Sequence, residues 1–201
     1  MRTTILSLLL LFSISISTTR AQQITPFKDG DRAVFLGNSI TDGGHYHSYI
    51  WLYYMTRFPD MRLSIINAGI GGDTAENMFK RLDGDVFAKR PTVLITTFGM
   101  NDTGYFEYNG DNASEFADKK VKDSYNWYKQ IESRYKTLVN TRIVLMGSSP
   151  YAETGKIEGN TPFRNKNEAM LRIVKFQEES AKENKWEFID LNRPIDRKSV
   201  V

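Results

Sequence analysis

The sequence predicts an α/β protein, a three-layer α/β/α sandwich built on a doubly wound, five-stranded parallel sheet. Two observations lead to this prediction. Five short apolar runs alternate along the chain with segments of helical character, which is the pattern of a parallel sheet covered on both faces. The 201 residues, 40% of them hydrophobic and 25% charged, have the size and composition of one globular domain.

Each strand is read from a short, mostly apolar run bounded by residues that break regular structure. Gly37 ends the first run, a glycine-rich segment follows the second, and Pro91 precedes the third. The five strands are expected at about residues 33–36, 63–66, 92–97, 142–147 and 186–191.

The helices are read from the segments between these runs and from their caps. Pro59 stops the first helix, and Asp73 or Thr74 can cap the second. Trp51 and Tyr54, at positions i and i+3 of the first helix, are expected in the core. The four helices are expected at about residues 46–58, 74–82, 114–138 and 164–184, with a loop at 150–163.

Composition excludes several classes of protein. Three Trp, ten Tyr and twelve Phe suffice for a sizeable core, which argues against a disordered, collagenous or coiled-coil chain. The absence of Cys excludes disulfides, thiolate metal sites, a Cys nucleophile and a lipid-modified Cys anchor. A net charge of +3 is too small and too dispersed to indicate a nucleic-acid partner.

The first 21 residues have the features of a secretory signal peptide. Arg2 precedes an apolar run at residues 5–16, and Thr19-Arg20-Ala21 offers small residues at a cleavage site. The run is too short to span the roughly 30 Å of a bilayer core, so no membrane anchor is expected. The sequence therefore predicts a secreted or periplasmic protein whose single domain occupies residues 22–201.

The first strand ends in a segment that suits a nucleophile. Ser39 lies at the turn from strand to helix, where its hydroxyl and its own amide would face the crevice at the edge of the sheet. Thr41 distinguishes the segment from the G-x-S-x-G elbow of α/β-hydrolases. Taken alone, these are also ordinary turn and cap residues.

The ends of the next two strands suit an oxyanion. Glycines up to Gly72 leave backbone N–H groups accessible, but Asp73 occupies the place where a phosphate loop needs Lys. The first strand is not followed by a dinucleotide fingerprint, so a flavodoxin-type cofactor protein is disfavoured. Asn101, after the third strand, adds a side-chain amide donor at the same edge. Together these groups supply a nucleophile and the donors for a tetrahedral intermediate.

Three blocks of the sequence resemble, in order, the first three blocks of the SGNH, or GDSL-like, hydrolases. They are Gly37-Asn38-Ser39-Ile40-Thr41, Asn67-Ala68-Gly69-Ile70-Gly71-Gly72-Asp73-Thr74 and Gly99-Met100-Asn101-Asp102. The resemblance implies a flavodoxin-like SGNH hydrolase fold, Ser39 as nucleophile, and an oxyanion hole formed by the amides of Ser39, Gly72 and the Asn101 side chain. It also implies an esterase or acylhydrolase that needs no metal or organic cofactor. Asn38 stands where the family usually has Asp, which leaves the serine in register.

The family's late Asp-x-x-His block, which supplies the base, has no match in this sequence. His occurs only at positions 45 and 47. We expect both at the rim of the cleft as substrate contacts or helix caps, together with Asn38 and Asp102 as substrate-binding residues. A metal held by the two His with Asp42 or Asp102 is disfavoured, because residues 45 and 47 do not share a face of a helix. The expectation is a domain cut short at its C-terminal end and weak or inactive as an esterase.

The segment after the third strand indicates the substrate. Aromatic and polar side chains occur together there, a combination that suits sugars, and no outward apolar loop for a long acyl chain is evident. The residues are Tyr105, Phe106, Tyr108, Asn109, Asp111 and Asn112. The hypothesis is removal of a small acyl group, such as acetyl, from a small-molecule or polysaccharide ester. The alternatives are a lipase or lysophospholipase, and a non-catalytic carbohydrate-binding module on the same fold.

Overall fold

The computed structural model describes residues 24–153 and 162–196. The expected signal peptide at residues 1–21 lies outside the described residues, as does the segment 154–161 of the expected loop. The part that is described contains the sheet, the helices and every candidate site residue.

All pairs of neighbouring strands are parallel, which confirms the predicted sheet. The strands are β1 (Arg32–Gly37), β2 (Ser64–Gly69), β3 (Val93–Phe98), β4 (Arg142–Gly147) and β5 (Glu187–Asp190). Their order is β2-β1-β3-β4-β5. The order reverses between β1 and β3, and a crevice for a ligand is expected beyond their carboxyl ends. Ser39 follows β1 and Asn101 follows β3, so both lie at this switch point.

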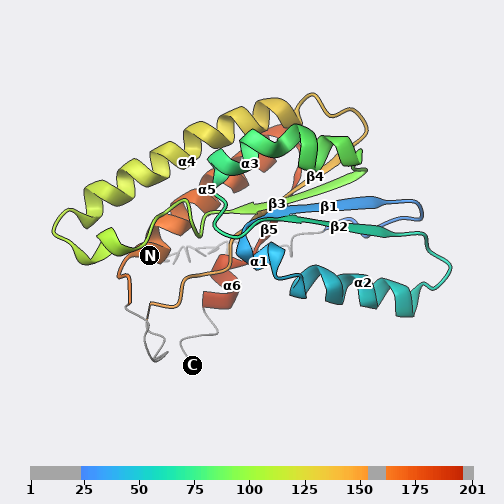
Figure 1. The fold of residues 1–201 in the computed structure, drawn as a ribbon, viewed down its shortest axis with the longest axis horizontal. Helices are drawn as coiled ribbons and strands as arrows, with labels where there is room; N and C mark the ends of the chain where they lie inside the picture. The colour runs from blue at the N-terminus through green and yellow to red at the C-terminus, as the bar shows by residue number, and fades with distance from the viewer. Residues whose placement is uncertain (1–23, 154–161, 197–201) are drawn as a thin grey trace, which may run out of the picture.

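Helices cover both faces of the sheet and complete the three layers (Figure 1). One face carries α3 (Ala75–Arg81), α4 (Ala113–Tyr135) and α5 (Lys166–Asn184). The other face carries α1 (Ser39–Asp42), α2 (His45–Arg57) and α6 (Asn192–Asp196). The three-layer α/β/α sandwich is therefore confirmed.

The core divides into two clusters, one on each face. The larger lies between the sheet and α3, α4 and α5, where Phe98 and Tyr128 stack with ring centroids 5.5 Å apart. The smaller contains Phe35 and Ile95 from the sheet, with Tyr46 and Ile50 of α2 packed against it. The larger cluster supports the helix N-termini and loops that hold the candidate site.

The expectation that Trp51 is a core residue is wrong, because its side chain is 44% exposed. Helix α2 contacts the sheet near its start, through Tyr46, His47 and Ile50, and its later aromatic residues lie nearer the surface. Tyr54 is half-buried, and its hydroxyl accepts a hydrogen bond from the Phe27 N–H at 3.1 Å.

Several elements differ from the sequence-based expectation. Strand β2 continues to Gly69, beyond the expected end at residue 66, because its last residues pair with β1 up to Gly37. The short helices have too few residues to show a hydrophobic period. They are α1, α6, a π-helix at Leu82–Val86, and 3₁₀ helices at Phe87–Lys89 and Phe106–Asn109.

Within the two described stretches of the chain, every helix is too short or too polar to cross a membrane.

Candidate active site

Ser39 is the first residue of α1, directly beyond the carboxyl end of β1. Asn38 caps this helix, because its Oδ1 accepts a hydrogen bond from the Ile40 N–H at 3.1 Å. Asn38 is 1% exposed, whereas Ser39 lies at the surface. Among the described residues, no hydrogen-bond partner is found for the Ser39 N–H. Both the hydroxyl and the amide of Ser39 are thus free to meet a substrate.

The end of β2 holds α1 close to the sheet. A Cβ at Gly69 would lie 2.2 Å from the Asp42 N, so only glycine allows this approach. The Asn67 side chain reinforces it, since Nδ2 donates to the Asp42 carbonyl at 3.0 Å and Oδ1 accepts from the Gly69 N–H at 2.9 Å. The turn that carries Ser39 is therefore fixed by backbone packing against the neighbouring strand.

Gly72 lies in the loop between β2 and α3. Its φ of +82° is in the left-handed region that favours glycine. A Cβ there would meet open space, and no partner for the Gly72 N–H is found in the described part of the chain. Thr74 then caps α3 by a capping box with Asn77, which confirms the expected cap.

The Asn101 side chain is held in one orientation. Its Nδ2 donates to the Asp73 carbonyl at 2.9 Å, and its Oδ1 accepts from the Tyr105 hydroxyl at 2.6 Å. A carbonyl can only accept, so the group facing Asp73 must be the NH₂. One N–H of Asn101 remains uncommitted by these two contacts. The bond to Asp73 places Asn101 beside the residue that follows Gly72.

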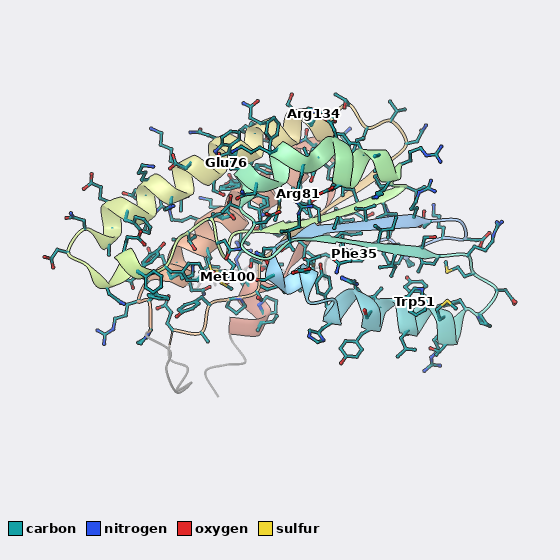
Figure 2. All side chains as sticks on the ribbon, in the orientation of Figure 1. Phe35, Trp51, Glu76, Arg81, Met100 and Arg134 are labelled. Atoms are coloured by element: carbon teal, nitrogen blue, oxygen red, sulfur yellow. The ribbon has the colours of Figure 1, made fainter. Side chains whose placement is uncertain are left out.

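Arg81 connects the loop of Asp73 to the ends of two strands (Figure 2). Its guanidinium lies 2.6 Å from the Asp73 carboxylate and donates to the carbonyls of Ala68 at 2.8 Å and Gly37 at 3.3 Å. Burial raises the pKa of the Asp73 carboxyl, and the adjacent guanidinium opposes that rise. This largely buried cation therefore links the end of β1, which precedes Ser39, to the end of β2 and to Asp73 beside Gly72.

Asp102 lies beneath the site. Its carboxylate accepts hydrogen bonds from the N–H groups of Ala75 and Gly99 and from the Ser124 hydroxyl, each at 2.9 Å. Burial raises the pKa of Asp102, while these donors oppose the rise. Asp102 is 6% exposed and its oxygens are used within the protein. Its geometry is that of a positioning group for the loop, in contrast to the expected substrate contact.

The two histidines occupy different environments. His47 is 5% exposed, its Nε2 lies 3.1 Å from the Thr41 carbonyl oxygen, and its ring packs 5.3 Å from that of Phe35. His45 is exposed and begins α2. The described residues contain no group of three or more His, Asp or Glu side chains that could hold a metal ion. His47 therefore has internal partners, whereas the side chain of His45 is exposed to solvent.

Sequence reasoning missed three residues that support the site: Arg81, Tyr105 and Lys166. Arg81 and Lys166 have the sequence pattern of solvated helix positions, yet both are buried or nearly so. Tyr105 was considered only as a substrate contact. Their partners are separated from them by loops, so the sequence carried no periodic signal for these contacts.

Comparison with known proteins assigns the chain to a family. The model of the GDSL-like Lipase/Acylhydrolase family matches residues 35–199, so the chain belongs to that family of ester hydrolases.

Three relatives indicate the breadth of the similarity. A solved structure described as BT4096, a gut microbial diltiazem-metabolizing enzyme, is 62% identical with a TM-score of 0.85, over 87% of this chain and 40% of that chain. The structure of Axe2, an acetylxylan esterase from Geobacillus stearothermophilus, has a TM-score of 0.69 at 21% identity, over 87% of this chain and 82% of that chain. An acetylxylan esterase from the same organism is 27% identical over 88 residues, which are 36% of this chain and 40% of that protein. The match to this chain thus covers less than half the length of the BT4096 structure.

Proposed function

We propose that this protein is a secreted serine ester hydrolase that removes a small acyl group, such as acetyl, from a carbohydrate. Ser39 is the nucleophile, and the N–H groups of Ser39, Gly72 and the Asn101 side chain form the oxyanion hole. The observation that carries this proposal is the 2.9 Å bond from Asn101 to the Asp73 carbonyl, which joins the loop after β3 to the Gly72 loop. Family membership supports the same assignment.

In the proposed reaction, the Ser39 Oγ attacks the carbonyl carbon of the ester as its proton passes to a base. The oxygen of the tetrahedral intermediate gains negative charge, which the three N–H donors stabilise. The intermediate collapses to acyl-Ser39 as its bond to the sugar oxygen breaks, and this oxygen takes up the proton from the base and leaves as a hydroxyl. Water then attacks the acyl group in the same way, releasing the carboxylic acid and restoring Ser39.

We assign no residue as the base that accepts the Ser39 proton. The only two imidazoles of the sequence are His45 and His47, and His47 is committed to the Thr41 carbonyl. Turnover by this chain is therefore proposed to be low, because removal of the histidine from a serine triad costs orders of magnitude in rate.

The loop after β3 supports a carbohydrate substrate. It begins at Tyr105, whose hydroxyl contacts Asn101, and continues to Phe106, which is 81% exposed and packs edge-on against Phe163 at 5.6 Å. Exposed rings beside polar side chains suit the faces and hydroxyls of a sugar. The acetylxylan esterases with the same fold support a small acyl group, since they act on acetylated xylan or xylooligosaccharide.

Secretion remains part of the proposal and rests on the signal-like residues 1–21. We accordingly place the hydrolase domain in residues 22–201.

The test compares the full chain with Ser39→Ala on acetylated xylooligosaccharide and on nitrophenyl acetate and long-chain nitrophenyl esters. Hydrolysis that prefers acetate and is lost in Ser39→Ala is expected, and Ser48→Ala, an exposed serine on α2, serves as the matched control. Preference for a long chain would favour a lipase or lysophospholipase. Sugar binding unchanged by Ser39→Ala, without labelling by a fluorophosphonate, would favour a binding module.

A second candidate substrate comes from the 62% identical relative, which is described as metabolizing diltiazem. Diltiazem is therefore included in the same comparison. Ser39-dependent turnover of diltiazem that exceeds turnover of acetylated xylooligosaccharide would replace the carbohydrate as substrate class.

A further inference from the structure

Lys166 is the first residue of α5, and its side chain is fully buried. An ammonium removed from water requires acceptors for its N–H groups. The Nζ donates to the Met100 carbonyl at 2.6 Å, to the Thr103 Oγ1 at 2.7 Å and to the Gly104 carbonyl. All three acceptors belong to the loop that carries Asn101. Lys166 thus fastens both ends of the segment from Met100 to Gly104.

The same ammonium contacts the residue that orients the Asn101 side chain. The Nζ lies 3.9 Å from the centroid of the Tyr105 ring, within the range of a cation–π interaction. At the other end of that ring, the hydroxyl donates to the Asn101 Oδ1 at 2.6 Å. Phe163 packs edge-on against the ring at 5.8 Å. The position of the Tyr105 hydroxyl therefore depends on the cation beneath its ring.

We propose that Lys166 and Tyr105 are positioning residues that hold one N–H of the Asn101 carboxamide toward the oxyanion. The proposal rests on the proposed function, because Asn101 acts on an oxyanion only in that reaction. Tyr105 occupies the Asn101 Oδ1 and the Asp73 carbonyl occupies one N–H, so a rotation of the carboxamide would break both bonds. The remaining N–H is directed before the substrate binds, which is the condition for efficient stabilisation of developing charge.

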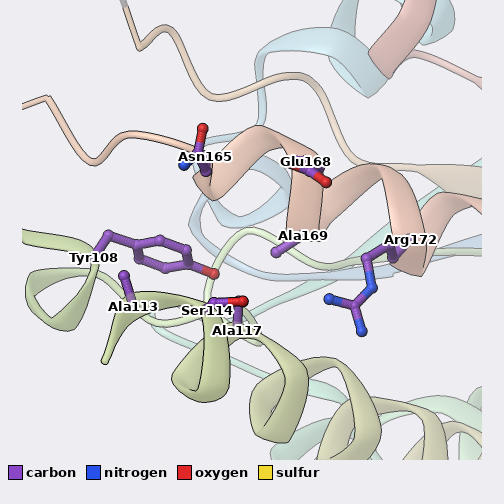
Figure 3. Close-up of a pocket in the computed structure, with 8 residues that line it drawn as sticks. All are labelled: Tyr108, Ala113, Ser114, Ala117, Asn165, Glu168, Ala169 and Arg172. Atoms are coloured by element: carbon purple, nitrogen blue, oxygen red, sulfur yellow. The ribbon is translucent and has the colours of Figure 1, made fainter. Parts of the chain in front are cut away.

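This role differs from general support of the fold. A purely structural Lys166 would affect the stability of the loop without a specific effect on the Asn101 amide. The chain offers a matched control in Tyr108, a buried tyrosine of the same loop region whose hydroxyl has no partner among the described residues. That hydroxyl points into a pocket of about 110 Å³ lined by residues of α4 and α5 (Figure 3).

The first measurement is the NMR signal of the Asn101 side-chain NH₂ in the full chain, assigned as the pair missing in Asn101→Asp. We expect Tyr105→Phe and Lys166→Met to shift this pair, whereas Tyr108→Phe leaves it in place. Tyr105→Phe keeps the ring and removes only the donor, so it is informative even where Lys166→Met fails to fold. An Asn101 signal that moves no further in Tyr105→Phe than in Tyr108→Phe overturns the proposal.

The second measurement is turnover of nitrophenyl acetate. We expect kcat to fall about 10- to 100-fold in Tyr105→Phe with KM within about twofold of the unmodified chain, as for the loss of preorganised geometry. Tyr108→Phe is expected to retain kcat. If Ser39→Ala leaves turnover unchanged, the proposed function fails, and the NMR comparison alone decides whether Lys166 and Tyr105 position Asn101.

Discussion

The Arg81 guanidinium and the Asp73 carboxylate form a contact of 2.6 Å in which both side chains are largely buried. The same guanidinium bonds to the carbonyl oxygens at the ends of β1 and β2. A planar fork of donors suits this task, because several N–H groups can be used in one plane. The pair therefore holds the Asp73 carbonyl in position to accept the Asn101 N–H.

Loss of this pair should be costly. We expect Arg81→Met to lower the free energy of unfolding by about 3–5 kcal/mol, because it leaves a buried carboxylate without its cation. Chemical denaturation measures this, and the loss should be smaller in acid, where Asp73 takes up a proton. Arg62→Met is the control, since its pair with Asp29 is exposed to solvent and its loss should lower stability far less. Equal losses in the two variants would contradict the interpretation.

Gly69→Ala, on the neighbouring strand, should displace the proposed nucleophile, Ser39. The new Cβ would lie 2.2 Å from the Asp42 N and 2.7 Å from the Thr41 carbonyl carbon, so α1 must move. We expect a loss of about 1–3 kcal/mol, as for overpacking, and weaker labelling of Ser39 by a fluorophosphonate. Gly84→Ala introduces a Cβ with no atom within 4 Å and should change neither quantity appreciably. Unchanged labelling of folded Gly69→Ala would show that α1 is not held by this contact.

Lys166 should make stability depend on pH. Burial lowers the pKa of its ammonium from 10.5 to about 7, although the charge of Asp102 opposes the change. The aromatic rings of Tyr105 and Tyr151 also face the ammonium, with centroids 3.9 and 5.7 Å from Nζ. Between about pH 7 and pH 10 the unfolded chain holds a proton that the folded chain lacks, so stability rises with pH by up to about 1.4 kcal/mol per unit.

The measurement is the difference in unfolding free energy between the unmodified chain and Lys166→Met. The unfolding free energy of the unmodified chain should increase relative to that of Lys166→Met from about pH 7 upward. Below about pH 7 the difference between the two should not change with pH. Lys175→Met, which replaces an exposed lysine on the same helix, is the control variant. A flat profile for Lys166→Met would mean that the ammonium keeps its proton throughout.

An external base should raise the proposed turnover. With His47 committed to the Thr41 carbonyl, added imidazole is expected to increase Ser39-dependent hydrolysis of nitrophenyl acetate several-fold. The rate with Ser39→Ala at each imidazole concentration supplies the background. His45→Ala tests whether the exposed imidazole already serves as a base. No gain above the background would argue that the missing base does not limit the rate.

Much of the fold could be predicted because buried parallel strands leave a strong local signal. The runs that became β1, β3 and β4 are continuous and apolar, and their order followed from the alternation with helices. The end of β2 was misplaced, since Asn67 and Gly69 are poor strand formers that pairing with β1 overrides. Trp51 was wrongly predicted to be a core residue, because the periodicity of a helix does not show how much of its length contacts the sheet.

The sequence could predict those candidate site residues that directly follow the ends of strands. Ser39, Gly72 and Asn101 were found in that way, and their roles stay predictions. Arg81 and Lys166 could not be found, because a charged residue on a helix is normally solvated. Both are buried through contacts with residues far away in the sequence. Arg81 bonds to the Gly37 carbonyl, 44 residues away, and Lys166 bonds to the Met100 carbonyl, 66 residues away.

Those long separations bear on how the site assembles during folding. The bond from Asn101 to Asp73 spans 28 residues and the bond from Arg81 to Gly37 spans 44. Such contacts form only after loop closure has brought distant strands into register. A partly folded chain can expose the Ser39 hydroxyl, but it lacks the assembled donors until β1, β2 and β3 align. The proposed reactivity of Ser39 toward esters would thereby depend on formation of the native sheet.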